Sequence, residues 1–297
     1  MKSILLKGGL GNQLFQFCLY LELSKKYKIK NLRLDKNTGF NIDYKYRRSY
    51  ELKNLKKDIL FTSRFVSFLN LIIFLSQKYF SKLLPILNFK IINDENYLNF
   101  DFNVLKRTKK KYLINGYFQN YQIVERNLPE LYNNIKPLLC RKVNNKFEKL
   151  YSEILSKENS VALCIRFYEE LNNPAFHSFD GKIVSPQDFN KVIKKIENKL
   201  KNPEFYIFIQ HNNKFINDLE FKSNYKIISH DNGYIGSWER LKAQSCCKHH
   251  IFNNSTFYFW GAIFSKYLNP NQGSEAIIFA SDNFIFREIY NHNWNLF

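Results

Sequence analysis

The chain contains 297 residues, 45% of them hydrophobic and 17% aromatic, which is enough for two domains with their own cores and excludes an intrinsically disordered protein. Lysine and arginine number 45 against 26 acidic residues, and the formal charge of +19 favours anionic ligands such as phosphorylated compounds or a membrane surface. The lysines are spread through the whole chain instead of forming one basic patch, so we do not expect specific binding to nucleic acid.

Cysteine spacing and the apolar segments indicate the compartment. The five cysteines include an adjacent pair, Cys246 and Cys247, and fit neither a zinc site nor a disulfide framework, which favours a reducing cytoplasm. The N-terminal apolar run is too short for a signal peptide, and the longest apolar region, 65–92, is too polar for a membrane span. Region 65–92 is interpreted either as an amphipathic helix lying on the inner face of the membrane or as a helix with one buried face. We therefore expect a cytoplasmic protein, with peripheral membrane contact as an open alternative.

The first predicted elements are a buried strand over residues 3–6, a glycine-rich loop over 8–13, a helix over 14–27 and a strand over 31–35. This order predicts a parallel sheet. The glycines permit close approach of the backbone to a ligand, but the loop lacks the dinucleotide-binding spacing and the lysine of a phosphate-binding loop. Amides at a helix start can bind the hydroxyls of a sugar; bracing of the loop is the alternative. The candidate residues are Gly9, Gly11, Asn12 and Gln13.

Residues 36–111 lack clear turn signals and are predicted to be mostly helical, with a helical insertion at about 50–110. Residues 112–119 predict a strand and a turn, and a helix is expected over 123–131 with a break at Pro129. Polar and basic residues cluster near 137–145. We place the domain boundary there, with an N-terminal domain over 1–140 and a C-terminal domain over 141–297.

The second half of the chain alternates strands and helices more clearly. Ser185 and Pro186 are typical of a helix start. The predicted strands are 161–165, 205–210, 225–229 and 250–253, and the predicted helices are 186–201, 212–220, 237–247 and 260–267. This pattern predicts a doubly wound sheet, in which ligands bind beyond the carboxyl ends of the strands. The polar residues expected at that edge are Arg166, Gln210, His211, His230 and Ser255.

A polar turn between residue 253 and an aromatic helix start is a candidate anion site, because a helix N-terminus presents unpaired N–H groups and a positive dipole end. The turn consists of Asn254, Ser255 and Thr256, and Phe257 is the candidate ring for stacking on a base. An ordinary capped helix is the alternative. Arg166, directly after an apolar strand, is a second candidate anion contact; an interdomain salt bridge is the alternative. If these two strand ends meet in one cleft, they would form a diphosphate site.

Other polar residues permit more than one interpretation. His249 and His250 point to opposite faces of a strand, so we do not expect them to share a metal ion. His177 and Asp180 either orient a substrate or lie in a mobile loop. No Asp-x-Asp triplet is present to bridge a divalent ion to two phosphates, so no metal cofactor is expected.

Four segments resemble glycosyltransferase family 11, the α-1,2-fucosyltransferases. Residues 8–17, with the sequence GGLGNQLFQF, are similar to the family's GGLGNQMFQY, and residues 116–119, GYFQ, to its GYWQ. The third segment, residues 247–262, contains CKH at 247–249 and NSTFYFWGA at 254–262, which are similar to the family's CKH and NSSFSWWGA. In the fourth segment, where the family has HxRRGDY, only Arg166 is retained, because Cys164 and Phe167 replace the histidine and the second arginine.

The resemblance implies an α/β fold of the GT-B type, in which two Rossmann-like, doubly wound domains face a cleft. It also implies an inverting, metal-independent transfer of fucose or a related deoxy sugar from a GDP-sugar to a hydroxyl of an oligosaccharide or lipid-linked surface glycan. The N-terminal domain would hold the acceptor and the C-terminal domain the nucleotide sugar. Arg166 inherits a diphosphate contact, and Glu169 and Glu170 are candidates for the general base. The alternative is a catalytically degenerate relative that binds glycan or acts as a scaffold.

Overall fold

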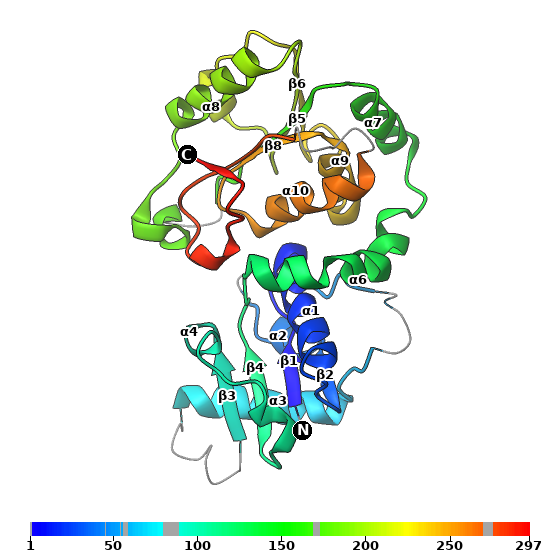
Figure 1. Ribbon diagram of the computed structural model, residues 1–297, viewed down its shortest axis with the longest axis vertical. Coiled ribbons are helices and arrows are strands. Elements are labelled where there is room, and N and C mark those ends of the chain that lie inside the picture. The colour runs from blue at the N-terminus through cyan, green and yellow to red at the C-terminus, as the bar shows by residue number, and fades with distance from the viewer. Residues whose placement is uncertain are drawn as a thin grey trace. The chain divides into compact units, whose positions relative to one another are not determined.

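The computed structural model describes residues 2–44, 46–53, 55, 59–79, 89–168, 173–269 and 276–297. The chain divides into two compact units between Lys136 and Pro137, close to the expected boundary after residue 140. Both units appear in Figure 1.

The N-terminal unit is built on a four-stranded sheet with the order β2-β1-β4-β3, in which every pairing is parallel. Its strands are β1 (Lys2–Leu5), β2 (Leu32–Asp35), β3 (Phe89–Asn93) and β4 (Lys111–Asn115). Its helices are α1 (Leu10–Lys25), α2 (Thr38–Asn41), α3 (Arg64–Tyr79), α4 (Asp94–Tyr97), α5 (Val104–Arg107) and α6 (Tyr121–Leu139), of which α6 ends just beyond the division.

Helix α3 settles part of the question about region 65–92. One side of α3 is buried, since Ile73 packs with Leu5 and Leu113 of the sheet. A second side of the same helix is apolar and exposed. It carries Phe65, Phe68, Ile72 and Leu75, whose spacing places them along one stripe. The helix is therefore both anchored in the protein and apolar toward solvent. The part of the region beyond residue 79 lies mostly outside the described residues.

Two expectations for the first half were wrong. Region 36–111 is not uniformly helical, because it contributes the edge strand β3, which pairs with β4 over its whole length. Helix α6 continues through Pro129. The proline removes one backbone donor, but the apolar face of α6, including Leu128 and Leu131, is buried, and this packing holds the helix together across the missing hydrogen bond.

The C-terminal unit is built on a six-stranded sheet with the order β10-β9-β8-β5-β6-β7, again parallel in every pairing. Its strands are β5 (Ser160–Cys164), β6 (Glu204–Phe208), β7 (Tyr225–Ile228), β8 (His249–Phe252), β9 (Ile278–Ala280) and β10 (Asn295–Leu296). Its helices are α7 (Asn145–Leu155), α8 (Pro186–Lys199), α9 (Ser237–Cys246) and α10 (Thr256–Leu268), with short 3-10 turns at Pro174–His177, Phe179–Gly181, Lys214–Asp218 and Arg287–Ile289.

Helices cover both faces of this sheet. Helix α8 begins with a capping box between Ser185 and Asp188, and its buried residues, including Phe189, pack against Val161 and Phe205 on one face. Helices α9 and α10 pack against each other on the other side of the sheet in Figure 1. A Cβ at Gly261 would lie 2.7 Å from the Gln244 side chain, so the α9–α10 contact depends on this glycine.

Two elements of the second half were not predicted correctly. The expected helix over 212–220 is only the 3-10 turn Lys214–Asp218, capped by the side chain of Asn213. Strands β9 and β10 were not predicted at all, because they are only three and two residues long and carry too little alternation to be recognised. The two parallel-sheet units nevertheless confirm the predicted α/β fold class, and two Rossmann-like units in one chain are what the GT-B type contains.

Candidate functional site

The order of strands in the C-terminal sheet singles out one position for a ligand. From β5 the chain continues to β6 and β7 on one side, whereas β8 is followed by β9 and β10 on the other side. Loops that leave β5 and β8 in opposite directions open a crevice at the carboxyl ends of these two strands, which is the usual binding position in doubly wound sheets. Arg166 follows β5 and Asn253 follows β8.

A buried amide joins the two strand ends at this position. The side chain of Asn253 accepts a hydrogen bond from the backbone N–H of Arg166 at 2.8 Å and donates one to the backbone carbonyl of Arg166, also at 2.8 Å. Tyr258, in the first turn of α10, donates to the carbonyl of Ile165 at 3.1 Å. Tyr168 donates to the carbonyl of Asn254 at 2.5 Å. The structure therefore brings together the arginine and the polar turn that the sequence predicted to converge.

The side chain of Arg166 is held over this edge by two neighbours. Its Nη1 donates to Oε1 of Gln210 at 2.8 Å, and its guanidinium carbon lies 4.9 Å from the centre of the Tyr168 ring. Gln210 is exposed. Next to it, His211 is also exposed and contacts Asp231 at 2.9 Å. Gln210 and His211 thus lie at the predicted edge beside Arg166.

The polar turn differs from its prediction in one respect. Ser255 is the residue before α10, but its hydroxyl makes no capping hydrogen bond, so the prediction of a hydroxyl cap is wrong. The Ser255 N–H instead bonds to the carbonyl of Asn253 at 2.6 Å, which tightens the turn. The first N–H groups of a helix have no partner within the helix, and Thr256 and Phe257 are only half-buried. The first N–H groups of α10 are therefore not capped by the Ser255 side chain.

Asn254 has a structural role in addition to its place in the turn. Its side-chain amide donates to the carbonyl of His177 at 2.7 Å and to the Ser178 hydroxyl at 3.1 Å. The His177 ring stacks on Tyr168 with 5.2 Å between ring centres. The amide nitrogen of Asn254 therefore anchors the segment that contains His177, and Asp180 follows it in a 3-10 turn with a positive φ of 51°.

Several predictions concern residues that make no contact at this edge or cannot be placed. Glu169 and Glu170, the predicted general-base candidates, lie outside the described residues. His249 and His250 are buried, and burial lowers their pKa to about 4 and about 3. Within the described ranges, no group of three or more His, Cys, Asp or Glu side chains is arranged to hold a metal ion.

The N-terminal sheet has an equivalent position between β1 and β4. The chain leads from β1 to β2 on one side, and β3 lies beyond β4 on the other. A buried amide again joins the two strand ends. Gln16 accepts a hydrogen bond from the backbone N–H of Lys7 at 3.0 Å and donates to the carbonyl of Gly116 at 2.8 Å. This second crevice therefore lies among Lys7, the glycine-rich loop and the turn after β4.

A lysine and an aspartate lie at this second position. The Lys7 ammonium donates to Oδ1 of Asn115 at 2.9 Å and lies 4.8 Å from the centre of the Tyr117 ring. Burial lowers the pKa of Lys7, and the nearby charge of Asp94 acts in the opposite direction. Asp94 accepts hydrogen bonds from the N–H groups of Tyr117 and Phe118, and burial raises its pKa. The position is polar and of mixed charge, which suits a neutral, hydroxylated ligand.

The four predicted residues of the glycine-rich loop separate into two groups. Gln13 is fully buried, and its amide bonds to the backbone of Gly8, Ser49 and Glu51, so in this structure it braces the loop, as the alternative stated. Gly11 is buried as well. Asn12 is half-buried and accepts from Gln119 at 3.2 Å. A Cβ on Gly9 would meet nothing within 4 Å, so Gly9 and Asn12 are the two of these residues that border open space.

The residues that organise both positions were missed by the sequence analysis. Asn253 was read as the last residue of a strand, Gln16 as part of a helix, and Lys7 as the residue before the loop. Asp94 follows β3, a strand that was not predicted. A polar residue directly after an apolar strand was the available signal for Lys7 and Asn253.

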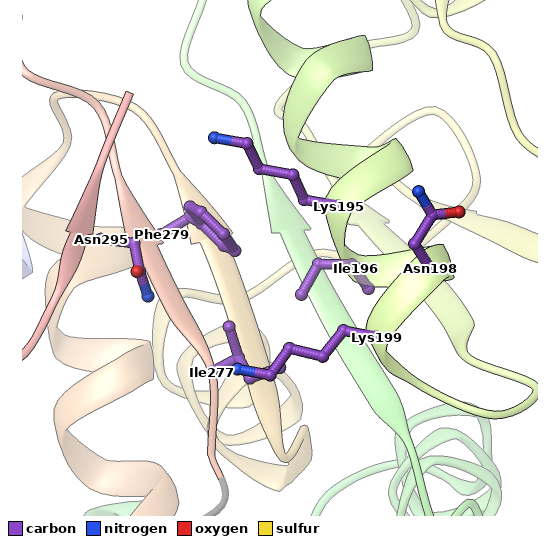
Figure 2. A pocket seen from close by; sticks show the side chains of 7 residues that line it. All are labelled: Lys195, Ile196, Asn198, Lys199, Ile277, Phe279 and Asn295. Carbon is purple, nitrogen blue, oxygen red and sulfur yellow. The ribbon is translucent and has the colours of Figure 1, made fainter.

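A cavity of about 450 Å³ lies elsewhere in the C-terminal unit. Figure 2 shows Lys195 and Lys199 extending from α8 over Ile277 and Phe279, with Asn295 opposite. The Lys195 ammonium lies 5.9 Å from the centre of the Phe279 ring. None of the predicted site residues lines this cavity.

Comparison with known proteins gives one full-length relative. The O-antigen biosynthesis glycosyltransferase WbnK of Escherichia coli is 26% identical over 294 residues, covering 94% of this chain and 95% of that protein. No protein-family model matches the chain. Among solved structures, a mutant of Arabidopsis thaliana FUT1 in complex with GDP matches 88% of this chain and 68% of its own, with 8% identity and a TM-score of 0.47. A glycosyl transferase family 9 protein of Veillonella parvula matches 94% and 80%, with 9% identity and a TM-score of 0.39.

The similarity to WbnK extends over both units and bears out the prediction of a glycosyltransferase. The narrower resemblance to family 11 stays a prediction. Among the described residues, no helix is both long and apolar enough to cross a membrane.

Proposed function

We propose that the protein transfers a sugar from a GDP-sugar to a hydroxyl group of a surface glycan, with inversion and without a metal ion. The observation that carries the proposal is the linkage of Arg166 to the polar turn at the crevice between β5 and β8, by way of Asn253. A guanidinium beside the open N-terminus of a helix suits a diphosphate. Fucose or a related deoxy sugar is the proposed donor sugar, on the resemblance to family 11.

The main catalytic task at this position is to stabilise the leaving diphosphate. Its negative charge grows as the bond to the sugar breaks, and preorganised donors lower the free energy of that transition state. Arg166 and the first N–H groups of α10 would supply this stabilisation. Glu169 or Glu170 remains the proposed base that takes the proton of the acceptor hydroxyl.

The acceptor is proposed to bind at the crevice between β1 and β4 of the N-terminal unit. Its polar groups are neutral amides together with Lys7 and Asp94, a set that can donate to and accept from sugar hydroxyls. WbnK is named for O-antigen biosynthesis, and we infer a similar role for this chain in the assembly of a surface polysaccharide, at the cytoplasmic face of the membrane.

Isothermal titration calorimetry with GDP, GMP and UDP tests the donor site. We expect GDP to bind, and Arg166→Ala to weaken GDP binding about ten-fold or more, because a charge-assisted contact is lost. Lys199→Gln, in the cavity of Figure 2, removes the same charge away from the proposed site and should leave the affinity for GDP unchanged.

The absence of heat with every nucleotide would contradict the proposed function. Mass spectrometry of a donor mixture then separates an active enzyme from the degenerate glycan-binding alternative. Consumption of a GDP-sugar, by transfer or by hydrolysis, excludes that alternative, whereas nucleotide binding without consumption supports it.

A further inference from the structure

Helix α9 contains a buried arginine without a balancing charge. The side chain of Arg240 is 6% exposed, and its Nη2 donates to the carbonyl of Ile209 at 2.5 Å. Its buried Nε has no hydrogen-bond partner, and Arg240 takes part in no ion pair within the part of the chain that the structure describes. Burial of a cation is costly unless an anion compensates it, so a buried arginine of this kind indicates that a negative group approaches in the functional state.

The ionisable groups around Arg240 do not provide that negative charge. Burial raises the pKa of the Cys164 thiol far above its usual range and that of the Tyr258 hydroxyl to about 12, so both are neutral at neutral pH. Burial also lowers the pKa of His230, and the charge of Arg240 lowers it further. The remaining neighbour, Arg166, is itself a cation that lowers the pKa of Arg240.

These neighbours place the Arg240 guanidinium close to the residues of the proposed donor site. Ile209 follows β6 and precedes Gln210, the residue that holds Arg166. Cys164 ends β5, and Tyr258 lies in the first turn of α10. Arg240 is therefore surrounded by the elements that form the crevice between β5 and β8, and its single hydrogen bond fixes the loop that carries Gln210.

We infer that Arg240 is the second positive charge of the donor site, a buried countercharge for the diphosphate that also positions Gln210 and Arg166. The inference rests on the proposed function and extends it to Arg240, a residue that contacts neither Arg166 nor the polar turn at 254–256. In a protein interior, unit charges several ångströms apart still interact appreciably, so the guanidinium acts on the diphosphate without being exposed to it.

A ligand series that differs only in phosphate charge tests this role. GDP, GMP and guanosine are titrated into the wild-type protein and into Arg240→Met, which keeps the side-chain volume and removes the charge. We expect the affinity for GDP to fall about 10- to 100-fold, the affinity for GMP to fall less and that for guanosine to stay unchanged. An equal loss for all three ligands, or no loss, would overturn the inference, because a merely structural residue does not distinguish phosphate charge.

Thermal unfolding of the free protein provides a second readout. Replacing an uncompensated buried cation by an apolar side chain should leave the melting temperature unchanged or raise it. GDP should also raise the melting temperature of Arg240→Met less than it raises the melting temperature of the wild-type protein. A variant that is strongly destabilised without ligand would show that Arg240 supports the fold instead, and would count against the inference.

Two further variants complete the experiment. Arg240→Lys keeps the charge and should retain most of the dependence on phosphate charge, although it loses the planar donor geometry. Arg141→Gln removes one positive charge that pairs with Glu239, the neighbour of Arg240 in α9, and should bind GDP as the wild type does. If the wild-type protein itself does not bind GDP, the proposed function fails. If wild-type binding is normal and Arg240→Met is unchanged, only the inference fails.

Discussion

The two parallel sheets have the same construction at their proposed ligand positions but differ in charge there. In each unit a buried amide links the two strand ends where the chain diverges, Gln16 in the first and Asn253 in the second. At the second position the described charged groups are the guanidinium of Arg166 and, close to it, that of Arg240. At the first position the ammonium of Lys7 lies near the carboxylate of Asp94.

The same sheet construction would thus bind an anion at the second position and sugar hydroxyls at the first, because the charged groups at the two positions differ. An excess of positive charge at a helix start selects a diphosphate. A lysine and a carboxylate together present donors and acceptors without an excess charge, which suits a sugar. In the proposed function, the topology of the sheet would determine where each ligand lies, and the few side chains directly after the strands would determine which ligand it is.

The largest predicted difference between the units is in their response to acid, because all six histidines lie in the C-terminal unit. Burial lowers the pKa of His250 to about 3, so the unfolded chain takes up a proton below about pH 6.5 and the folded unit does not. Stability is therefore lost as the pH falls below that value, by about 2 kcal/mol between pH 7 and pH 5 from His250 alone. His249, with its pKa lowered to about 4, adds to the loss in the same direction.

Urea unfolding at the two pH values measures this loss. The three tryptophans, Trp238, Trp260 and Trp294, all lie in the C-terminal unit, so their fluorescence reports on its unfolding. His250→Leu should reduce the difference in unfolding free energy between pH 7 and pH 5, and the exposed His292→Gln should not. An unchanged pH dependence in His250→Leu would contradict the prediction.

A smaller effect is expected from the lysine of the N-terminal unit. Lys7→Met keeps the apolar part of the side chain and removes the ammonium that lies over the Tyr117 ring, so the KM for the glycan acceptor should rise about ten-fold, as for the loss of one hydrogen bond to a charged group. The affinity for GDP, measured by calorimetry, should stay the same. Lys25→Met, which removes an exposed lysine of the same unit, is the matched control. A change in GDP affinity with no change in acceptor KM would invert the assignment of the two positions.

The smallest predicted effect concerns the exposed apolar stripe of α3. Phe65 is 69% exposed and Phe68 is 58% exposed, and with the positive charge of the protein they fit the surface of an anionic lipid membrane. We expect the wild-type protein to sediment with vesicles that contain anionic phospholipid, and Phe65→Gln with Phe68→Gln to reduce the bound fraction a few-fold. Leu98→Gln, at another exposed apolar side chain of this unit, should have no effect. Equal sedimentation of the double variant and the wild type would contradict membrane contact by α3.

The sequence by itself determined the alternation of strands and helices in the second half, the parallel sheets and the two polar strand ends, at Arg166 and before Ser255, that we propose bind an anion. These features depend on local patterns: apolar runs, a Ser-Pro helix start and polar residues directly after strands. The helix over 212–220 and the break at Pro129 were predicted incorrectly, because burial of apolar faces outweighs local preference and is not visible in a short window.

Only the tertiary structure decided which of the polar residues are buried and which are accessible. Gln13 and Asn12 are adjacent, yet one is fully buried and bonded to the backbone while the other borders open space. Arg240 has no distinguishing neighbour in the sequence. Its proposed role rests on neighbours from β5, from the residue after β6 and from α10, which surround it without a negative charge. The distance between such groups is set by how the strands are ordered in the sheet.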